Sequence, residues 1–307
     1  MEIQLLDKSM ITKMASSFCD LYRLSFSDHV DELYVIKRYV DNPYDDLLMC
    51  VAIEDGEIIA NAAAIPTRII IGGKTYKAAV AINVMVHPSH KGKGLYAKLA
   101  HILYDDMKTK GYSILYVFPN YISNRIFIEK LGHQCVYEIP TLELDLISYS
   151  ITMHKKETKI MPDFTDKYLE ICKNSDIYIS KEHAYMTYRY KNHPYNDYSL
   201  AFLSQCTWAV LKQYQDILNI VEFHSENTEG ASDLLHDVIA YAKKIQVSRV
   251  TTWSKTNTYE HLLFEKTGFR NKYPITYFSV WSLDSNITTD IYDYRKWNIQ
   301  MGDDYVY

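Results

Sequence analysis

The sequence predicts a mixed α/β fold of two similar units, each a central mixed, largely antiparallel sheet flanked by helices. Three observations carry this prediction. The 307 residues are enough for about two domains. Short apolar segments typical of strands alternate with segments whose apolar residues follow the period of a helix. Finally, two motifs occur twice, in the same order, along the chain.

These repeated motifs define the two units. Arg38-Tyr39-x-x-x-Pro43-Tyr44 returns 151 residues later as Arg189-Tyr190-x-x-x-Pro194-Tyr195. A second motif, IFIEKLG, returns 136 residues after its first occurrence as LLFEKTG, so the second unit is about 15 residues shorter between the two motifs. We therefore expect a tandem duplication, with a first unit over residues 1–145, a second over 155–285 and a C-terminal tail over 286–307.

The elements of the first unit follow from apolar spacing and turn residues. A strand at 3–6 leads to helices over 9–24 and 28–40, and the second helix ends before Asn42-Pro43 because proline disfavours a helical residue in front of it. Asp55-Gly56 predicts a hairpin turn between strands at 47–53 and 57–65, and Gly72-Gly73 a further turn before the strand at 77–86. A helix from Leu95 to Gly111, a strand at 112–118, a helix at 123–131 capped by Ser123 and a strand at 134–139 complete the unit.

The second unit repeats this order. Helices are expected at 163–173, 181–191, 231–244 and 260–266, and strands at 199–204, 207–213, 217–223, 249–253 and 275–281. The segment 144–160 joins the units.

Charge, cysteines and hydropathy exclude several classes of function. A net charge of −5 and a pI near 6.1 give no basic stripe, so no nucleic-acid partner is expected. The five cysteines are scattered without a Cys-x-x-Cys pair, and His87, His90 and His101 lack metal-ligand spacing, so we expect thiols and no metal. The N-terminus does not resemble a signal peptide, and the longest apolar stretches are about half the length of a membrane helix, so we expect a cytoplasmic protein without a membrane partner.

A glycine-bearing loop follows the strand at 77–86 and precedes a helix. In this arrangement the first N–H groups of the helix and its dipole face an anion. Gly92 and Gly94 allow the backbone to approach a phosphate, and Lys91, Lys93 and Lys98 add positive charge. We expect a pyrophosphate or ribose phosphate here; the alternative is a flexible solvated turn.

Two other phosphate motifs fit this loop less well. A P-loop ends in Gly-Lys-Ser/Thr, but Gly94 is followed by Leu95. A dinucleotide fingerprint is met by Gly92, Gly94 and Ala97, but the next strand ends in YVFPN, without the acidic residue that would hold a ribose.

The segment VMVHPSHKGKGLYAKL resembles the acyl-CoA loop of the GNAT superfamily of N-acyltransferases, where Arg/Gln-Gly-x-Gly-x-Gly/Ala opens a helix. Lys91 stands where Arg or Gln is usual, and Tyr96 where Gly or Ala is usual. FPNYISNRIFIEKLGH resembles the family's next element, with His133 in the place of a Phe. The second unit shares only this later element, and its counterpart of the loop, HSENTEGASDLL, has one glycine and no lysine. The resemblance implies a tandem GNAT chain with a degenerate second unit.

The resemblance also implies a reaction, in which an acceptor amine attacks the thioester of an acyl-CoA, most simply acetyl-CoA, as co-substrate. The backbone N–H groups of Lys91, Gly92, Lys93, Gly94, Leu95 and Tyr96 would grip the pyrophosphate. A backbone N–H around Met85 or Val86 would polarise the thioester carbonyl. Asn124 would bind the pantetheine arm.

The proton donor and the base are less clearly marked. Many family members carry a Tyr four residues before the Gly of Lys-Leu-Gly, and this position is Ile128. Tyr121 or Tyr96 then supplies the proton, unless the thiolate leaves unaided, as a thiol with a pKa of about 8.5 can. The candidates for the base are Asp28, Asp31, Glu32, His87, Asp303, Asp304 and the terminal carboxylate.

The aromatic end of the chain, RKWNIQMGDDYVY, favours a tail that packs back near the active site, as in similar tandem GNAT proteins. The carboxylate of Tyr307 would then act as base, and Asp304 would hold the ammonium group of the acceptor. The alternative is that Tyr305 and Tyr307 only attach the tail to the second unit.

The acceptor expected from 28 tyrosines and an acidic balance is a small polar amine, for example an amino sugar, because Tyr stacks on sugar faces and carboxylates hold ammonium groups. A protein lysine or N-terminus is an alternative acceptor, and a non-catalytic acyl-CoA-binding protein is an alternative class. Aminoacyl-tRNA, used by the FemX-like group, fits the charge and the loop less well.

Overall fold

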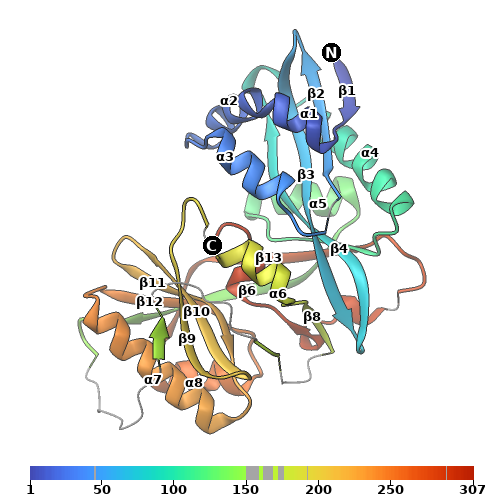
Figure 1. The fold of residues 1–307 in the computed structure, drawn as a ribbon. Helices are drawn as coiled ribbons and strands as arrows, with labels where there is room; N and C mark the ends of the chain where they lie inside the picture. The colour runs from blue at the N-terminus through green and yellow to red at the C-terminus, as the bar shows by residue number, and fades with distance from the viewer. Residues whose placement is uncertain (45, 150–158, 162–168, 172–175, 192, 288) are drawn as a thin grey trace. The chain divides into compact units, whose positions relative to one another are not determined.

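The computed structural model describes residues 1–307 except 45, 150–158, 162–168, 172–175, 192 and 288 (Figure 1). It divides into two compact units. Unit 1 comprises Met1–Tyr137 and Tyr277–Tyr294, and unit 2 comprises Glu138–Thr276 and Arg295–Tyr307. Strands and helices alternate in both, which confirms the predicted mixed α/β fold.

The sheet of unit 1 runs in the order β1 (Glu2–Leu5), β2 (Leu48–Glu54), β3 (Glu57–Ile71), β4 (Lys74–Val86), β5 (Ile114–Val117) and the end of β13 (Arg270–Ser282). Neighbours are antiparallel except β4 and β5, which are parallel. The helices are α1 (Lys8–Lys13), α2 (Ala15–Phe26), α3 (Glu32–Val35), the π-helix η1 (Ile36–Val40), α4 (Leu95–Thr109) and α5 (Tyr121–Leu131), with a short 3₁₀ turn, η2 (Pro88–His90).

Both faces of this sheet are covered. Leu48 and Cys50 share a core cluster with Leu99 and Leu103 of α4, while Met49, which points to the opposite face of β2, is also fully buried. Burial on both faces explains why these strands read as nearly continuous apolar runs.

Helix boundaries in unit 1 differ from the predicted ones at three places. The helix predicted at 9–24 is divided at Met14 into α1 and α2. Asp31 caps α3, so that helix begins at Glu32 and not at residue 28. Asn120, rather than Ser123, caps α5 by accepting a hydrogen bond of 2.9 Å from Ser123 N.

The sheet of unit 2 runs in the order β6 (Gln134–Asp145), β12 (Arg249–Trp253), β11 (Ile217–His224), β10 (Thr207–Tyr214), β9 (Tyr198–Ser204) and β7 (Lys159–Met161). β11 and β12 are parallel, whereas the pairs β6–β12, β10–β11, β9–β10 and β7–β9 are antiparallel. Its helices are α6 (His183–Tyr190), α7 (Thr228–Lys244) and α8 (Tyr259–Thr267), and β8 (Ile177–Ile179) pairs with β14 (Trp297–Asn298). Most of the helix predicted at 163–173 lies outside the described residues.

The last strand of each repeat belongs to the other unit. Thr141–Asp145 of β6 pair with β12 in unit 2, and Ser279–Ser282 of β13 pair with β5 in unit 1. The structure therefore divides the chain near Tyr137 and Tyr277, where the sequence suggested boundaries at 145–155 and 285. An alternating apolar pattern fixes which face of a strand is buried, but it does not fix which strand lies at its edge.

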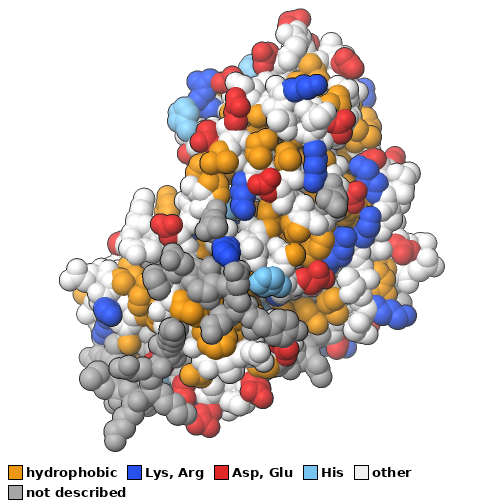
Figure 2. Space-filling view, in the orientation of Figure 1, with side chains coloured by type: hydrophobic (Ala, Val, Ile, Leu, Met, Phe, Trp, Pro, Cys, Tyr) orange, Lys and Arg blue, Asp and Glu red, His pale blue; other side chains and the backbone are white. Residues whose placement is uncertain are grey.

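Three further features concern the chain as a whole. None of the helices in the described residues is long and apolar enough to cross a membrane. On the face drawn in Figure 2, acidic and basic side chains are interspersed. Cys19, Cys50 and Cys135 are free thiols, whereas Cys206 is disulfide-bonded, so the expectation of a thiol was wrong for Cys206.

Candidate functional site

The loop between β4 and α4 takes a conformation that requires its glycines. Gly92 has φ +79° and Gly94 has φ +69°, in the left-handed region where L residues are strained. No atom lies within 4 Å of a Cβ built at either glycine, so it is backbone conformation and not crowding that demands glycine. The backbone at these two glycines is consequently not covered by other atoms of the protein on the side where a Cβ would lie.

The N-terminus of α4 is left without a side-chain cap. Gly94 is the N-cap residue, and the first turn holds no acidic side chain. The first bond of the helix runs from Lys98 N to Gly94 O at 3.2 Å, so the N–H groups of Leu95, Tyr96 and Ala97 have no acceptor within the helix. With Lys91 and Lys93 exposed beside them, these donors suit an anion.

The corresponding helix of unit 2, α7, has both a side-chain cap and an acidic residue at its N-terminus. The side chain of Asn227 caps α7 by accepting a hydrogen bond of 2.8 Å from Gly230 N, and Glu229 places a negative charge in the first turn. An anion there meets a donor that is already used and a negative charge that repels it.

Hydrogen bonds give the exact correspondence of the two units along β4 and β11. Ser113 N donates to Lys77 O, and Ser248 N donates to Asp216 O, both at 2.9 Å. The first parallel pairs follow directly, Ala78 with Ile114 and Ile217 with Arg249. Five residues further on, β4 carries Asn83 and β11 carries Glu222.

Asn83 is the centre of a polar network in unit 1. Its Nδ2 donates to the hydroxyl oxygens of Tyr39 at 2.8 Å and Tyr34 at 3.2 Å. Its carbonyl oxygen accepts a hydrogen bond of 2.8 Å from Asn61 Nδ2. Asn61, Tyr34 and Tyr39 are buried, whereas Asn83 is half-buried. Sequence reasoning missed Asn61, Asn83 and Tyr34, and it marked Tyr39 only as part of a repeated motif with a structural role.

Residues 8–135 match the family model of an acetyltransferase (GNAT) domain. This stretch of the chain is therefore similar to GNAT domains. The matched range contains the loop, the N-terminus of α4 and the Asn83 network.

Solved structures with this fold cover both units. A protein of Enterococcus faecalis V583, described as a probable N-acyltransferase, superposes with a TM-score of 0.69 at 14% identity, over 92% of this chain and 72% of that one. Two GCN5-related N-acetyltransferases are also similar to this chain. That of Anabaena variabilis has a TM-score of 0.67 at 13% identity, over 92% of this chain and 73% of that one. That of Kribbella flavida has a TM-score of 0.65 at 14% identity, over 91% of this chain and 70% of that one. At these identities the likeness shows the fold alone. A comparison with curated proteins finds no match.

The other predicted residues of the GNAT domain occupy varied surroundings. Met85 is fully buried and Val86 ends β4. Tyr96 is buried with its ring 6.1 Å from that of Phe127, and burial raises the pKa of its hydroxyl. Asn124 is buried, and its Oδ1 accepts a hydrogen bond of 2.9 Å from Ser279 Oγ. Tyr121 is 80% exposed at the start of α5, seven residues before the half-exposed Ile128.

Several candidates for the base already hold structural hydrogen bonds. Asp31 caps α3, accepting from Tyr34 N at 3.1 Å, and Asp28 accepts from His29 N at 2.8 Å. His87 Nδ1 lies 2.7 Å from Ser89 Oγ in the turn that follows β4. Across the described residues, no group of three His, Cys, Asp or Glu side chains is arranged to hold a metal ion.

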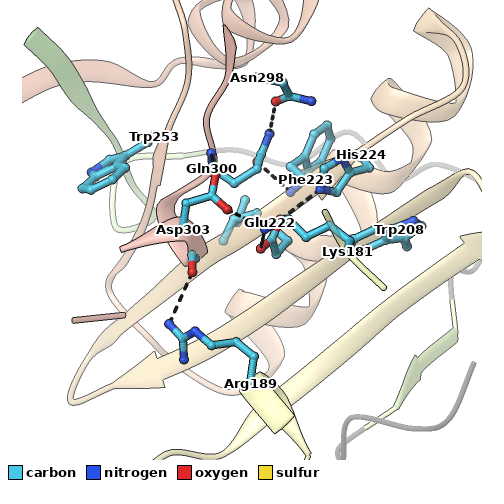
Figure 3. A network of polar contacts seen from close by, with 12 residues as sticks. Lys181, Arg189, Trp208, Glu222, Phe223, His224, Trp253, Asn298, Gln300 and Asp303 are labelled. Atoms are coloured by element: carbon cyan, nitrogen blue, oxygen red, sulfur yellow. Dashed lines mark hydrogen bonds and ion pairs between the residues drawn. The ribbon is translucent and has the colours of Figure 1, made fainter. Parts of the chain in front are cut away.

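In unit 2, Glu222 lies in a buried cluster of charges (Figure 3). Lys181 Nζ lies 2.5 Å from Glu222 Oε1 and 2.6 Å from Asp303 Oδ1, and His224 Nε2 lies 3.0 Å from Glu222 Oε2. Burial alone would raise the pKa of Glu222, but Lys181 and His224 outweigh it and lower that pKa. Burial raises the pKa of Asp303, because Lys181 only partly offsets the loss of water.

The chain end is bound into the same unit. Gln300 Oε1 accepts a hydrogen bond of 3.1 Å from Phe223 N, on the strand that corresponds to β4. The carbonyl oxygen of Tyr307 accepts hydrogen bonds from Arg189 and from Tyr198, the latter at 3.0 Å. The Asp304 side chain accepts from Val306 N at 3.3 Å. These contacts of Asp304 and Tyr307 are with residues of unit 2, and a catalytic role for the two residues stays a prediction.

Proposed function

We propose that this chain is an acyl-CoA-dependent N-acyltransferase, transferring acetyl from acetyl-CoA to the primary amine of a small polar acceptor. The open N-terminus of α4 carries this proposal. Gly94 caps the helix without a side chain, its first N–H groups lack acceptors in the helix, and two exposed lysines precede it. This is the donor set that a pyrophosphate needs, and GNAT domains use acyl-CoA as co-substrate.

The contrast with unit 2 supports the proposal that a single CoA binds per chain. Asn227 and Glu229 occupy the positions around the N-terminus of α7 that an anion would need. The backbone N–H of Phe223 already donates a hydrogen bond to the side chain of Gln300. Phe223 is the residue of β11 that corresponds to Val84 of β4. Unit 2 in this proposal is the degenerate GNAT unit of a tandem chain.

In the proposed reaction, the acceptor nitrogen forms a bond to the thioester carbonyl carbon, the carbon–sulfur bond breaks and CoA leaves as a thiolate. The backbone N–H groups of Lys91–Tyr96 bind the pyrophosphate, and a backbone N–H at Met85 or Val86 binds the carbonyl oxygen. One such donor typically contributes about 10²- to 10³-fold in rate. The amine proton passes to a base, which contributes about 10²- to 10⁴-fold.

For proton transfer we retain three candidates. Tyr121 is the exposed tyrosine closest in sequence to Ile128, so it is the candidate proton donor to the thiolate. The terminal carboxylate at Tyr307 and Asp304 are the candidates for the base and for binding of the ammonium group. The guanidinium of Arg189 donates a hydrogen bond to Tyr307 at the chain end. A neighbouring cation makes a carboxylate a weaker base, so this contact disfavours the terminal carboxylate as the base.

The acceptor proposed is a small amine with several hydroxyl groups, such as an amino sugar. Tyrosine hydroxyls and amides gather around Asn83. Such groups bind hydroxyl groups and sugar faces.

Release of free thiol from acetyl-CoA in the presence of a panel of amines tests the proposal. We expect release above the rate without acceptor for at least one small polyhydroxylated amine, with a product heavier by one acetyl group. Acetylation of a protein lysine or N-terminus in preference to every small amine would contradict the proposed acceptor. CoA binding without thiol release from any amine would contradict the enzyme and support a binding protein.

A further inference from the structure

Asn83 lies in a bulge of β4 with an unusual backbone conformation. The register of β3 and β4 pairs Asn61 with Met85 and Ala63 with Ile82, so Ala62 faces two residues, Asn83 and Val84. Asn83 has φ +50°, and among the described residues it is the one non-glycine residue with positive φ that lies inside a strand. Asparagine tolerates the left-handed region better than most residues.

Both the main chain and the side chain of Asn83 are held. Asn61, which is fully buried, donates to its carbonyl oxygen at 2.8 Å. On the side-chain end, the amide donates to Tyr39 of η1 and Tyr34 of α3. A π-helical turn such as η1 often marks a functional site, and it is this turn that carries Tyr39. The bulge is therefore fixed from the adjacent strand and from the helices that pack on the sheet.

Unit 2 has the tyrosine contact and a bulge in β11, where Val221 is the extra residue opposite Val210 and Leu211, but this bulge holds no residue with positive φ. Tyr190 donates a hydrogen bond to Glu222, whereas Tyr39 accepts one from Asn83, and Glu222 does not have positive φ. Trp208, which pairs with His224, stands where unit 1 has Asn61, which pairs with Met85. A left-handed residue inside a strand, held by an amide clamp, thus occurs in the unit with the open helix N-terminus, and the described strands of the other unit hold no such residue.

We propose that Asn83 is a positioning residue of acyl transfer: held by Asn61, Tyr34 and Tyr39, it fixes the direction of Val84–Val86, whose backbone N–H groups bind the thioester carbonyl. This inference rests on the proposed function. Strained residues that their surroundings hold in place concentrate at functional sites. A carbonyl-binding N–H must be aligned to within a fraction of an ångström, and a shift of 1 Å can cost about 100-fold in rate.

Two substitutions separate the clamp from general stability. Asn83→Gly keeps the left-handed backbone accessible but removes the amide, and Tyr39→Phe removes one hydroxyl of the clamp. Asn42→Ala is the matched control in the same unit. Asn42 is 2% exposed and also bonds the main chain, donating to Pro66 O at 3.1 Å and accepting from Tyr44 N at 2.9 Å, but it lies outside β4.

We expect Asn83→Gly to lower kcat for acetyl transfer by about 10- to 100-fold and Tyr39→Phe by about 10-fold, with the Kd for CoA within about twofold of wild type. Asn42→Ala should lower the melting temperature as much or more and leave kcat within about threefold. A kcat for Asn83→Gly equal to that of Asn42→Ala, or a Kd for CoA that rises as much as kcat falls, would overturn the proposal.

Amide hydrogen exchange separates this inference from the proposed function. If wild type releases no thiol with any amine, the proposed function fails, but the clamp is still measurable in the free protein. Exchange at Met85 and Val86 should be at least about tenfold faster in Asn83→Gly than in Asn42→Ala. Equal exchange in the two variants would overturn the clamp itself.

Discussion

Tyr190 donates a hydrogen bond of 2.6 Å to Glu222, at the strand position where unit 1 carries Asn83 bonded to Tyr39. The tyrosine of the repeated Arg-Tyr motif thus reaches the same place on the sheet in both units. What differs is the residue it meets. Unit 1 has a neutral, half-buried amide there, and unit 2 has a fully buried carboxylate that pairs with Lys181.

Replacing Lys181 by methionine should destabilise unit 2 strongly. The change leaves Glu222 and Asp303, whose side chains are 0% and 1% exposed, without their cation. Breaking a buried pair by removing one partner costs about 3–5 kcal/mol. Chemical denaturation checks this, with Lys296→Met as control, because its pair with Asp176 is exposed and should be worth about 0–1 kcal/mol. Equal losses in the two variants would contradict the importance of the buried cluster.

Gly302→Ala should loosen the attachment of the tail. A Cβ at this position would overlap the Tyr190 hydroxyl and lie 2.8 Å from Glu222 Oε1. We expect a loss of about 1–3 kcal/mol in the free energy of unfolding. Tyr190→Phe in the same chain removes the overlapping oxygen and should recover part of that loss in a double-mutant cycle. Additive losses would show that the overlap is not the cause.

His133 should make the stability of unit 1 depend on pH. Burial among Tyr104, Phe127 and Trp281 lowers the pKa of His133 to about 3, below the usual 6.5, and its Nδ1 has no hydrogen-bond partner in the described structure. The unfolded chain therefore binds one more proton between these values. The stability that the neutral ring contributes is complete above pH 6.5 and is lost as the pH falls toward 3, by up to about 1.4 kcal/mol per unit.

His133→Phe should remove this slope, because phenylalanine cannot be protonated. Denaturation curves of both proteins from pH 7 to pH 4 provide the measurement. A slope that is the same in wild type and variant would place the acid sensitivity elsewhere.

Removing Val306 and Tyr307 tests the tail in two ways. Arg189 is 2% exposed and loses an acceptor, so we expect a lower melting temperature. Turnover at a temperature where the truncated protein is still folded decides the catalytic role. A fall of about 10² or more supports the terminal carboxylate as base. Turnover unchanged within about threefold removes the tail from the mechanism.

The sequence was sufficient for the features that depend on local pattern. The alternation of strands and helices, the repeated motifs and the loop at Gly92 and Gly94 are all visible in short segments. The sequence did not show that β6 pairs with β12 and β13 with β5, because strand pairing depends on contacts between residues far apart in the chain. The ion pair of Lys181 and Asp303 joins residues 122 positions apart, and no sequence motif indicates it. Asn83 was missed because its conformation arises from a bulge between two long strands, and the sequence there reads as uninterrupted strand.

Calorimetric titration of CoA into the full chain tests the central claim, that the loop at Lys91–Tyr96 is the single acyl-CoA site. Gly94→Leu should raise the Kd at least about tenfold, or 1.4 kcal/mol, because a side chain at φ +69° strains the loop and blocks the phosphate. Gly73→Leu is the matched control, with φ +80° and equally open surroundings in the turn between β3 and β4, and should leave the Kd unchanged. One site per chain, weakened by the first variant alone, is the predicted result. Two sites per chain, or a Kd that Gly94→Leu does not alter, would contradict the account.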